Sequence, residues 1–372
     1  MRSAAALHLP MTAAALDPAP TRLWTPKRVL VTRSAAERPH GQRILARLEA
    51  AGIDRVELLT GDRLPNLRGD GDRAAFMAAK DTMAVVVPAP SQRELQPIPP
   101  SADWRVDLAQ GCPAHCQYCY LAGSLSGPPI TRVFADLDEV LHDLDRWVGR
   151  GTITSGTLAR GGEGTTFEAS CYTDPLAIEH LTGGLATAIT HFGTHDWAGP
   201  VQLRATTKFD DVAGLLGLPH GGRTRLRFSV NATSVDRRFE GATSSVPARL
   251  GALAAVAAAG YPVGVTIAPI MPVESWREEY ADLLDGIAAA TAGADLTVEL
   301  ITHRFTPGSK ATLTDWYPRT RVDMDESRRT TKRGRFGSVK HVYPKDTMAE
   351  LRTWFEAAVA ERLTQARLLY WT

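Results

Sequence analysis

Short apolar runs alternate with longer amphipathic runs between about residue 104 and residue 305, which predicts strands followed by helices. The predicted strands are Trp104–Leu108, Thr166–Ser170, Val201–Thr206, Arg225–Asn231, Val263–Ala268 and Leu296–Ile301. The predicted helices between them are Leu137–Val148, Leu176–His191, Phe209–Leu216, Ser245–Ala259 and Trp276–Ala292. Such alternation is typical of parallel strands joined by helical crossovers. A complete barrel needs eight units, so six favour a partial (β/α)6 TIM-type barrel, and an open doubly wound sheet stays possible.

The flanking segments have different patterns. Upstream, predicted strands at Lys27–Thr32, Val56–Leu59 and Met83–Val87 and a predicted helix at Gly41–Ala51 indicate a small α/β unit. Downstream, residues 328–340 carry six basic side chains and no acidic one, a local charge of +6, before a predicted helix from Thr347 to about Ala366. The expected organisation is a disordered leader (1–24), a small α/β domain (25–90), a proline-rich linker (91–103), the partial barrel (104–305) and a C-terminal extension with a basic hairpin and a closing helix (306–372).

Composition narrows the class of protein. The 372 residues are 44% hydrophobic and 22% charged with a net charge of +1, which is ordinary for a globular protein and excludes disorder as the main state. The near-neutral charge also means that nucleic-acid binding must come from a local patch. No run of about 18 apolar residues exists, so no membrane span is expected. Four cysteines are too few for a disulfide scaffold, which suits a reducing, cytoplasmic setting.

Three of the four cysteines, Cys112, Cys116 and Cys119, fall within eight residues and form a C-x3-C-x2-C motif. Three thiolates on one tight loop can bind three irons of a cluster. Ferredoxin-type spacings and structural zinc sites both supply four ligands. Three ligands therefore leave one iron of the cluster open to an exogenous molecule. The alternative interpretation of the motif is a structural zinc-binding loop.

This motif, with an aromatic residue before its third cysteine, resembles the signature of radical S-adenosylmethionine (SAM) enzymes. The resemblance implies a 4Fe–4S cluster, S-adenosyl-L-methionine and a 5′-deoxyadenosyl radical that abstracts a hydrogen atom. It also implies a partial (β/α)6 barrel, in agreement with the six predicted units. The cysteine loop follows the first predicted strand and thus lies where barrels carry their sites.

Seven ordered blocks resemble the spore photoproduct lyase family more closely. They run from about residue 25 to the C-terminus, with insertions around 122–128 and 149–165. The blocks are Ser101–Trp104 with Gly111–Leu121, Phe167–Asp174, Thr207–Phe209, Arg225–Asn231, Ile267–Ile270, Glu299–Thr306 and Lys332–Gly337.

The lyase resemblance implies roles for three candidate catalytic residues. Cys171 would return a hydrogen atom to the substrate radical, because an S–H bond is weak enough to quench a carbon radical. Tyr120, and with it Tyr118, would relay the hydrogen atom between this thiol and deoxyadenosine. Without the resemblance, a lone cysteine is usually a small buried hydrophobe, and the tyrosines would be packing around the cluster.

The candidate cofactor-binding residues lie near predicted strand ends. Lys208 matches a position that the family uses to hold the cofactor, and its charge suits the cofactor's carboxylate. Ser229, Thr173 and Asn231 are the other candidates for polar contacts. The Gly161–Glu163 segment resembles a cofactor-binding Gly-Gly-Glu motif, but it precedes a predicted strand and is expected at the end opposite the cysteines.

The resemblance also implies that the basic tract grips damaged DNA. The expected contacts are Arg304, Arg333, Arg335, Lys340 and Tyr343, although a basic tract alone is usually a solvated face. Two joined thymines cannot reach a buried cofactor while stacked, so the lesion must be flipped out of the helix. Phosphate contacts of this number make binding strongly dependent on salt.

The expected function is a radical SAM carbon–carbon lyase that reverts the thymine–thymine spore photoproduct in UV-damaged DNA to two thymines. The expected electron donor is a flavodoxin or ferredoxin, and the protein is expected to be a monomer. One alternative is an enzyme of the same lineage that acts on a different nucleobase or other substrate. The other is a non-catalytic metal-containing nucleic-acid-binding protein, which would show a fully ligated metal and no cofactor binding.

Overall fold

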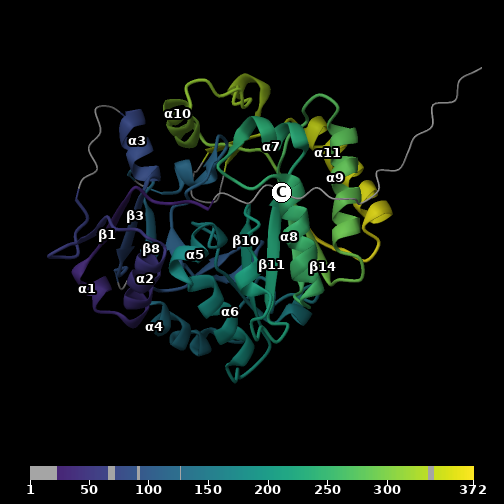
Figure 1. Ribbon diagram of the computed structural model, residues 1–372. Coiled ribbons are helices and arrows are strands. Elements are labelled where there is room, and N and C mark those ends of the chain that lie inside the picture. The colour runs from purple at the N-terminus through teal and green to yellow at the C-terminus, as the bar shows by residue number, and fades with distance from the viewer. Residues whose placement is uncertain (1–22, 66–71, 90–92, 126, 334–338) are drawn as a thin grey trace, which may run out of the picture.

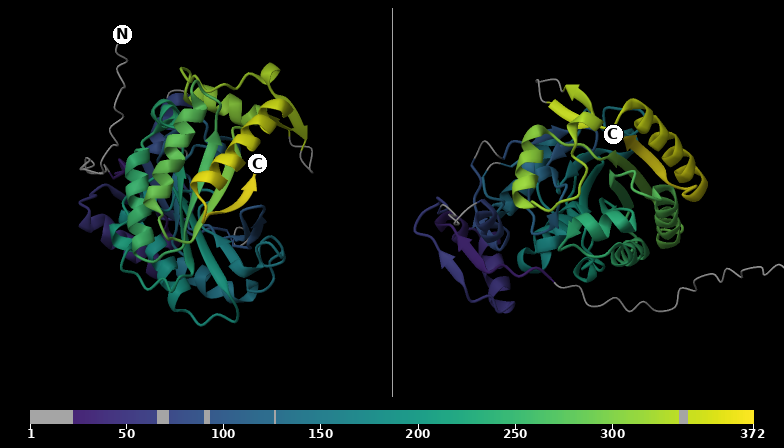
Figure 2. Two further views of the ribbon diagram at one scale, coloured as in Figure 1. Left: turned by 90° about the vertical axis from the view of Figure 1, so that its right-hand side faces the viewer. Right: turned by 90° about the horizontal axis from the view of Figure 1, so that it is seen from above.

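The computed structural model describes residues 23–65, 72–89, 93–125, 127–333 and 339–372, and nearly all of the expected leader lies outside them. Two sheets dominate the molecule. A small α/β unit built on one sheet lies beside a larger curled sheet, on the side away from the last helix and strand of the chain (Figures 1 and 2).

The larger sheet is a partial barrel. Its eight strands run in the order β17-β14-β13-β11-β10-β9-β5-β4. The six predicted strands form its centre, and all are parallel to their neighbours. Antiparallel β4 closes one edge and parallel β17, which the hydrophobic pattern did not identify, closes the other. The bounds are β4 Gln96–Ile98, β5 Ala102–Arg105, β9 Thr165–Glu168, β10 Val201–Thr207, β11 Thr224–Val230, β13 Val263–Ile270, β14 Leu296–Thr302 and β17 Arg367–Trp371.

Helices cover the outer face of this sheet (Figure 2). Helix α8 packs on β11 and β13 with Leu253 and Val256 fully buried, and α9 packs between α8 and α11. The predicted helix Phe209–Leu216 is only a short 3-10 turn, because Gly214 and Gly217 weaken a helix there and Pro219 follows. The helical bounds are α4 Leu137–His142, α5 Glu179–Thr182, α6 Gly184–Thr194, α7 Thr233–Phe239, α8 Val246–Ala258, α9 Trp276–Ala290, α10 Pro307–Trp316 and α11 Lys345–Arg362.

The predicted helix Leu176–His191 is interrupted. Gly183 takes a left-handed conformation with φ of +63°, which ends α5 and lets α6 begin in a new direction. Ahead of α5 lies a 3-10 turn, Leu176–Ile178.

The N-terminal unit extends beyond residues 25–90. Its five strands run in the order β2-β1-β3-β8-β6, and the last two come from segments that the hydrophobic pattern assigned to the barrel. Strand β8 is parallel to β3, and β6 is antiparallel to β8. The bounds are β1 Arg28–Val31, α1 Arg33–Ala36, α2 Pro39–Ala50, β2 Val56–Leu58, α3 Asp72–Lys80, β3 Thr82–Val86, β6 Ala109–Gln110 and β8 Thr131–Phe134.

The barrel interior holds buried ion pairs near the middle and the amino ends of the strands. Arg227 of β11 bonds to Glu299 of β14 at 2.7 Å and also to Glu168 of β9. Nearer the amino ends, Glu163 bonds to Arg204 of β10 and pairs with Arg160 at 3.0 Å. The expectation that Gly161–Glu163 lies away from the cysteines is therefore confirmed.

The expected basic hairpin is present after α10. Strand β15 (Thr330–Arg333) is antiparallel to β16 (Val339–Val342), with Lys332 opposite Lys340. The closing helix is α11, and the chain then returns to the barrel as β17. No helix in the described part of the chain has the length and apolar character to cross a membrane.

Candidate active site

The cysteine loop is fixed at several points at the carboxyl side of the barrel. It begins at β6, and Gly111 has a φ of +88°. A Cβ at this glycine would lie 2.2 Å from the carbonyl oxygen of Ile130, so only glycine fits. Within the loop, the two-residue strand β7 (His115–Cys116) pairs with β12 (Glu240–Gly241), which follows α7.

All four cysteines are free thiols. Burial raises the pKa of Cys112 to about 12 and raises the pKa of Cys116 further, so both thiols are protonated at neutral pH. Iron binding must therefore release protons from this loop.

The donor set of the loop fits a 4Fe–4S cluster better than a single metal ion. Among the described residues, no group of three His, Cys, Asp or Glu side chains converges as it would on one ion. In a four-iron cluster each thiolate binds its own iron, so the sulfurs need not converge on one point. Cys112, Cys116 and Cys119 supply three soft thiol donors on one short loop, which is the chemistry that such a cluster requires.

A buried polar group lies next to this loop and includes two of the predicted residues. Lys208 Nζ donates to Glu240 Oε1 at 2.8 Å and to the Tyr118 hydroxyl at 3.0 Å, and that hydroxyl donates to Glu240. Arg249 donates to the other oxygen of Glu240 at 2.7 Å. Burial would raise the pKa of Glu240, but the charges of Lys208 and Arg249 outweigh it and lower that pKa to about 2.

Cys171 and Tyr120 are neighbours. The Tyr120 hydroxyl donates to the backbone carbonyl of Cys171, although the two residues are 51 positions apart in the sequence. Tyr120 is 60% exposed and Cys171 is half-buried, so both border open space. Burial, and after it the charge of Asp107, raises the pKa of the Cys171 thiol to about 12. The thiol therefore keeps its hydrogen at neutral pH.

The remaining predicted cofactor residues differ in how they are bonded. Thr173 is buried, and its Oγ1 has no hydrogen-bond partner in the described structure, so it is free to bind a ligand. Ser229 is buried at the end of β11, and its carbonyl accepts from Arg249 at 2.9 Å. Asn231 is bonded within the protein: it donates to the Pro269 carbonyl at 2.9 Å and accepts from the Tyr280 hydroxyl at 2.7 Å.

Two of the predicted DNA contacts, Arg304 and Lys340, form a basic cluster with Lys332 at the hairpin. Arg304, Arg333 and Lys340 are exposed. Burial, and then the neighbouring charges of Arg304 and Lys332, lower the pKa of Lys340, which indicates that these cations lie close together. Tyr343 differs, because it is buried beneath the guanidinium of Arg329, 3.9 Å from its ring centre. Arg335 lies outside the described residues.

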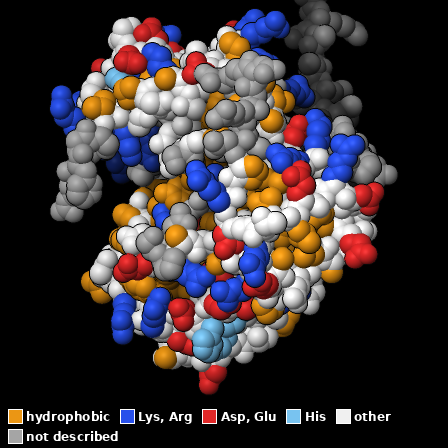
Figure 3. Space-filling model, turned by 90° about the vertical axis from the view of Figure 1, so that its left-hand side faces the viewer, with side chains coloured by type: hydrophobic (Ala, Val, Ile, Leu, Met, Phe, Trp, Pro, Cys, Tyr) orange, Lys and Arg blue, Asp and Glu red, His pale blue; other side chains and the backbone are white. Residues whose placement is uncertain are grey.

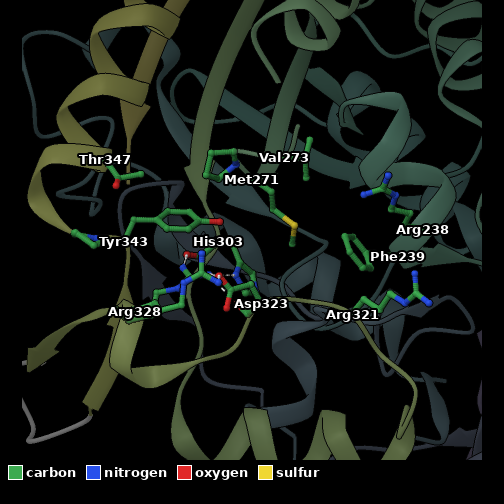
Figure 4. Close-up of a pocket in the computed structure, with 13 residues that line it drawn as sticks. Arg238, Phe239, Met271, Val273, His303, Arg321, Asp323, Arg328, Tyr343 and Thr347 are labelled. Atoms are coloured by element: carbon green, nitrogen blue, oxygen red, sulfur yellow. Dashed lines mark hydrogen bonds and ion pairs between the residues drawn. The ribbon is translucent and has the colours of Figure 1, made fainter. Parts of the chain in front are cut away.

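A cavity of about 490 Å³ lies between the carboxyl ends of β13 and β14 and the C-terminal extension. His303 and Tyr343 lie on one side of it, and Arg238, Phe239 and Arg321 lie on the other (Figure 4). Phe239 directly precedes Glu240 in the chain, but Lys208, Glu240 and Arg249 are not among the residues that line the cavity.

Sequence reasoning missed Glu240, Arg249 and Asp174. Asp174 is buried, and its carboxylate accepts a hydrogen bond from the Lys208 backbone amide at 2.7 Å. This bond fixes the backbone of Lys208. Glu240 lies in the connection after β11, and Arg249 lies in α8. Acidic and basic residues in such segments are usually solvated. Only the block around Asp174 carried a signal, because that residue closes the matched segment Phe167–Asp174.

Solved structures identify the class to which this fold and site belong. A spore photoproduct lyase with bound AdoMet and dinucleoside spore photoproduct matches with a TM-score of 0.85 and 34% identity, over 94% of this chain and 100% of that one. A spore photoproduct lyase complexed with dinucleoside spore photoproduct matches with the same score and coverage. The protein thus has the fold of a radical SAM enzyme, with its three-cysteine loop at the carboxyl side of a partial barrel.

Sequence comparisons are more specific. The family model described as spore photoproduct lyase matches residues 24–372. The spore photoproduct lyase of Bacillus subtilis (strain 168) is 36% identical over 352 residues, which cover 94% of this chain and 99% of the relative. That of Clostridium acetobutylicum is 31% identical over 88% of this chain and 94% of the relative. The chain therefore belongs to the spore photoproduct lyase family.

Proposed function

We propose that this protein is a radical SAM lyase that repairs the spore photoproduct, a cross-linked pair of thymines, by restoring two thymines. The observation that carries the proposal is the contact between Tyr120 and Cys171 beside the three-cysteine loop. Through the backbone carbonyl of Cys171, this contact holds a phenol, which can carry a radical, next to the residue that bears the hydrogen-donating thiol.

Cys112, Cys116 and Cys119 would hold the 4Fe–4S cluster, and the unpartnered hydroxyl of Thr173 would contact S-adenosyl-L-methionine. When bound, the cluster and S-adenosyl-L-methionine supply the 5′-deoxyadenosyl radical that starts the repair by taking a hydrogen atom from the lesion.

Lys208 positions the cofactor's carboxylate in this proposal. Its side chain is 15% exposed, and its ammonium group already pairs with Glu240. Because Arg249 also neutralises Glu240, the lysine can turn part of its charge toward an incoming carboxylate without leaving Glu240 unpaired.

Cys171 completes the reaction by donating a hydrogen atom from Sγ to the thymine radical that remains after the inter-base bond breaks. The raised pKa of the thiol suits this role, because a thiolate has no S–H bond to donate. Tyr120 would then return a hydrogen atom to the sulfur and would regain one, with Tyr118 as part of the relay, from the methyl group of 5′-deoxyadenosine. The short contact of Tyr118 with Glu240 holds its ring in place.

DNA binds across the C-terminal extension in this account. Arg304, Arg333 and Lys340 contact phosphates, and Arg335, which lies outside the described residues, is a further proposed contact. The cavity of Figure 4 admits the flipped strand, because its volume suits a nucleoside-sized group and Arg238 and Arg321 flank it. A flavodoxin or ferredoxin in the cytoplasm reduces the cluster, and one copy of the chain is sufficient.

The test is an anaerobic reaction of the iron-loaded, dithionite-reduced protein with S-adenosyl-L-methionine and a thymine dinucleotide that carries the lesion. Chromatography of the products is expected to show plain thymine dinucleotide. A Cys116→Ala variant is the matched control and is expected to give no product, because one iron ligand is missing.

Each other result selects an alternative. Deoxyadenosine without repaired dinucleotide would keep the radical enzyme and reject this substrate in favour of a different nucleobase. If protein with a full iron content forms neither product, the result would favour the non-catalytic, metal-containing nucleic-acid-binding protein.

A further inference from the structure

The N-terminal unit holds the cysteine loop through one buried side chain. Lys80 is the last residue of α3, and only 5% of it is exposed. Its Nζ donates to the backbone carbonyls of Cys112 at 2.6 Å and of Ala114 at 2.5 Å. Two of the first three residues of the C-x3-C segment are therefore bonded to a cation from another unit of the fold.

Lys80 has no carboxylate partner among the described residues. The adjacent Asp81 pairs instead with Lys27, at 2.7 Å. A buried cation is costly unless an anion or several hydrogen bonds compensate it. Two carbonyl dipoles compensate Lys80 in part, and thiolates on the loop that it contacts would supply the missing negative charge.

Aromatic packing keeps α3 against the loop. Phe76, one turn before Lys80, stacks on Trp316 of α10 with ring centres 4.6 Å apart and meets the His115 ring edge-on at 5.8 Å. Tyr317 contacts the same phenylalanine at 5.4 Å. The helix therefore lies between the cysteine loop and α10, and Lys80 has little freedom to move away.

The face of the molecule that carries the N-terminal unit does not gather charge of one sign. Positive and negative side chains are interspersed on it (Figure 3). Arg28 pairs with Glu57, and Arg43 pairs with Asp138, both at 2.7 Å. Among the described residues, this face shows no basic stripe of the kind that DNA binding requires. The contact with the cysteine loop is the feature from which we infer a role for the unit.

We propose that Lys80 is a positioning residue of the iron–sulfur centre, which fixes the loop that carries the thiolates and supplies a positive charge beside it. The inference rests on the proposed function, because it requires the cluster. One-electron reduction adds a negative charge to a cluster that three thiolates already make anionic. A fixed cation in a buried place favours the reduced form and raises the reduction potential.

The experiment compares the wild type with Lys80→Gln, which keeps a hydrogen-bond donor and removes the charge. Lys80→Arg keeps the charge, and Lys27→Gln is the matched control because it removes an exposed lysine of the same unit. Each protein is loaded with iron and sulfide under anaerobic conditions, without S-adenosyl-L-methionine or DNA. Iron content, circular dichroism and the midpoint potential from an EPR-monitored redox titration are then measured.

The proposal predicts that Lys80→Gln lowers the ratio of reduced to oxidised cluster about tenfold at a fixed potential, which is about 59 mV for one electron. Lys80→Arg and Lys27→Gln should keep the wild-type potential. Loss of iron from folded Lys80→Gln with retention in Lys80→Arg would support the positioning role as well.

Lys80→Gln with wild-type iron content and midpoint potential would overturn the inference, and so would equal loss of iron from the Gln and Arg variants. A wild-type protein that takes up no cluster would instead refute the proposed function, so the two failures are distinguishable.

Discussion

Two buried ionic groups occupy opposite parts of the same barrel and differ in how completely they are satisfied. Toward the amino ends, Arg160 and Arg204 enclose Glu163, and deeper in the barrel Arg227 bridges Glu168 and Glu299. At the carboxyl ends, Lys208 and Arg249 enclose Glu240. The second group lies on the side of the barrel that carries the free cysteines of the loop and Thr173, whose hydroxyl has no hydrogen-bond partner in the described structure.

The difference shows which charges serve the fold and which serve chemistry. The interior pairs link β9, β10, β11 and β14 and leave no room for a ligand, because each carboxylate already has an arginine. The carboxyl-end group instead joins the cysteine loop, because the Tyr118 hydroxyl, between Cys116 and Cys119 in the sequence, bonds to both Lys208 and Glu240. Substitutions in the first group should thus change stability, and substitutions in the second should change binding and turnover.

The largest effect is expected for Arg227→Met. This change removes the only arginine between Glu168 and Glu299 and leaves two buried carboxylates without that partner. The free energy of unfolding should fall by about 3–5 kcal/mol, as measured by urea denaturation of the iron-free protein. A loss below about 1 kcal/mol would mean that the interior pairs are not essential to the fold.

A smaller effect, on binding, is expected for Lys208→Met. Arg249 continues to neutralise Glu240 in this variant, so the protein should stay folded. The affinity of the cluster-loaded protein for S-adenosyl-L-methionine should fall about tenfold, which is about 1.4 kcal/mol, in anaerobic equilibrium dialysis. Lys208→Arg is the control that keeps the charge. Unchanged affinity in Lys208→Met would remove this lysine from the cofactor site.

The smallest effect concerns pH. The pKa of Cys171 is raised to about 12, so its thiol stays protonated while an ordinary thiol ionises near pH 8.5. The associated stabilisation is complete below the unfolded pKa and is lost as the pH rises toward 12.

At pH 9 only about 0.1% of the folded Cys171 is thiolate, so its alkylation by iodoacetamide should be hundreds of times slower than in urea-unfolded protein. Peptide mass spectrometry separates Cys171 from the other cysteines. Alkylation at the unfolded rate would contradict a protected, protonated hydrogen donor.

The hydrophobic pattern was sufficient to predict the barrel strands, because apolar and polar residues largely alternate along β10 and β11 and β13 is nearly apolar throughout. It did not predict the edges. Strand β17 is half-exposed, so its apolar pattern is weak. Strand β8 lies in the segment predicted as barrel but pairs with β3 of the N-terminal unit, and this pairing depends on tertiary contacts. Gly183 divides one predicted helix, which periodicity alone does not reveal because Leu181 and Leu185 keep the apolar spacing across it.

The chemistry was predictable where a motif is local. The spacing of Cys112, Cys116 and Cys119 and the matched block around Cys171 sufficed for those residues. Glu240 and Lys80 could not be found in this way. Each approaches the cysteine loop from a distant part of the chain, and an isolated Lys or Glu in a sequence is most often a solvated surface residue.

The most direct test of the account compares two variants, one from each group of the barrel, in the lesion-repair reaction. Cys171→Ala is expected to form deoxyadenosine but to lose most of the repaired thymine dinucleotide, because the hydrogen donor is absent. Glu163→Gln is expected to repair the lesion at the wild-type rate per folded, iron-loaded molecule, because its group only maintains the fold. Full repair by Cys171→Ala, or no repair by folded Glu163→Gln, would contradict the account.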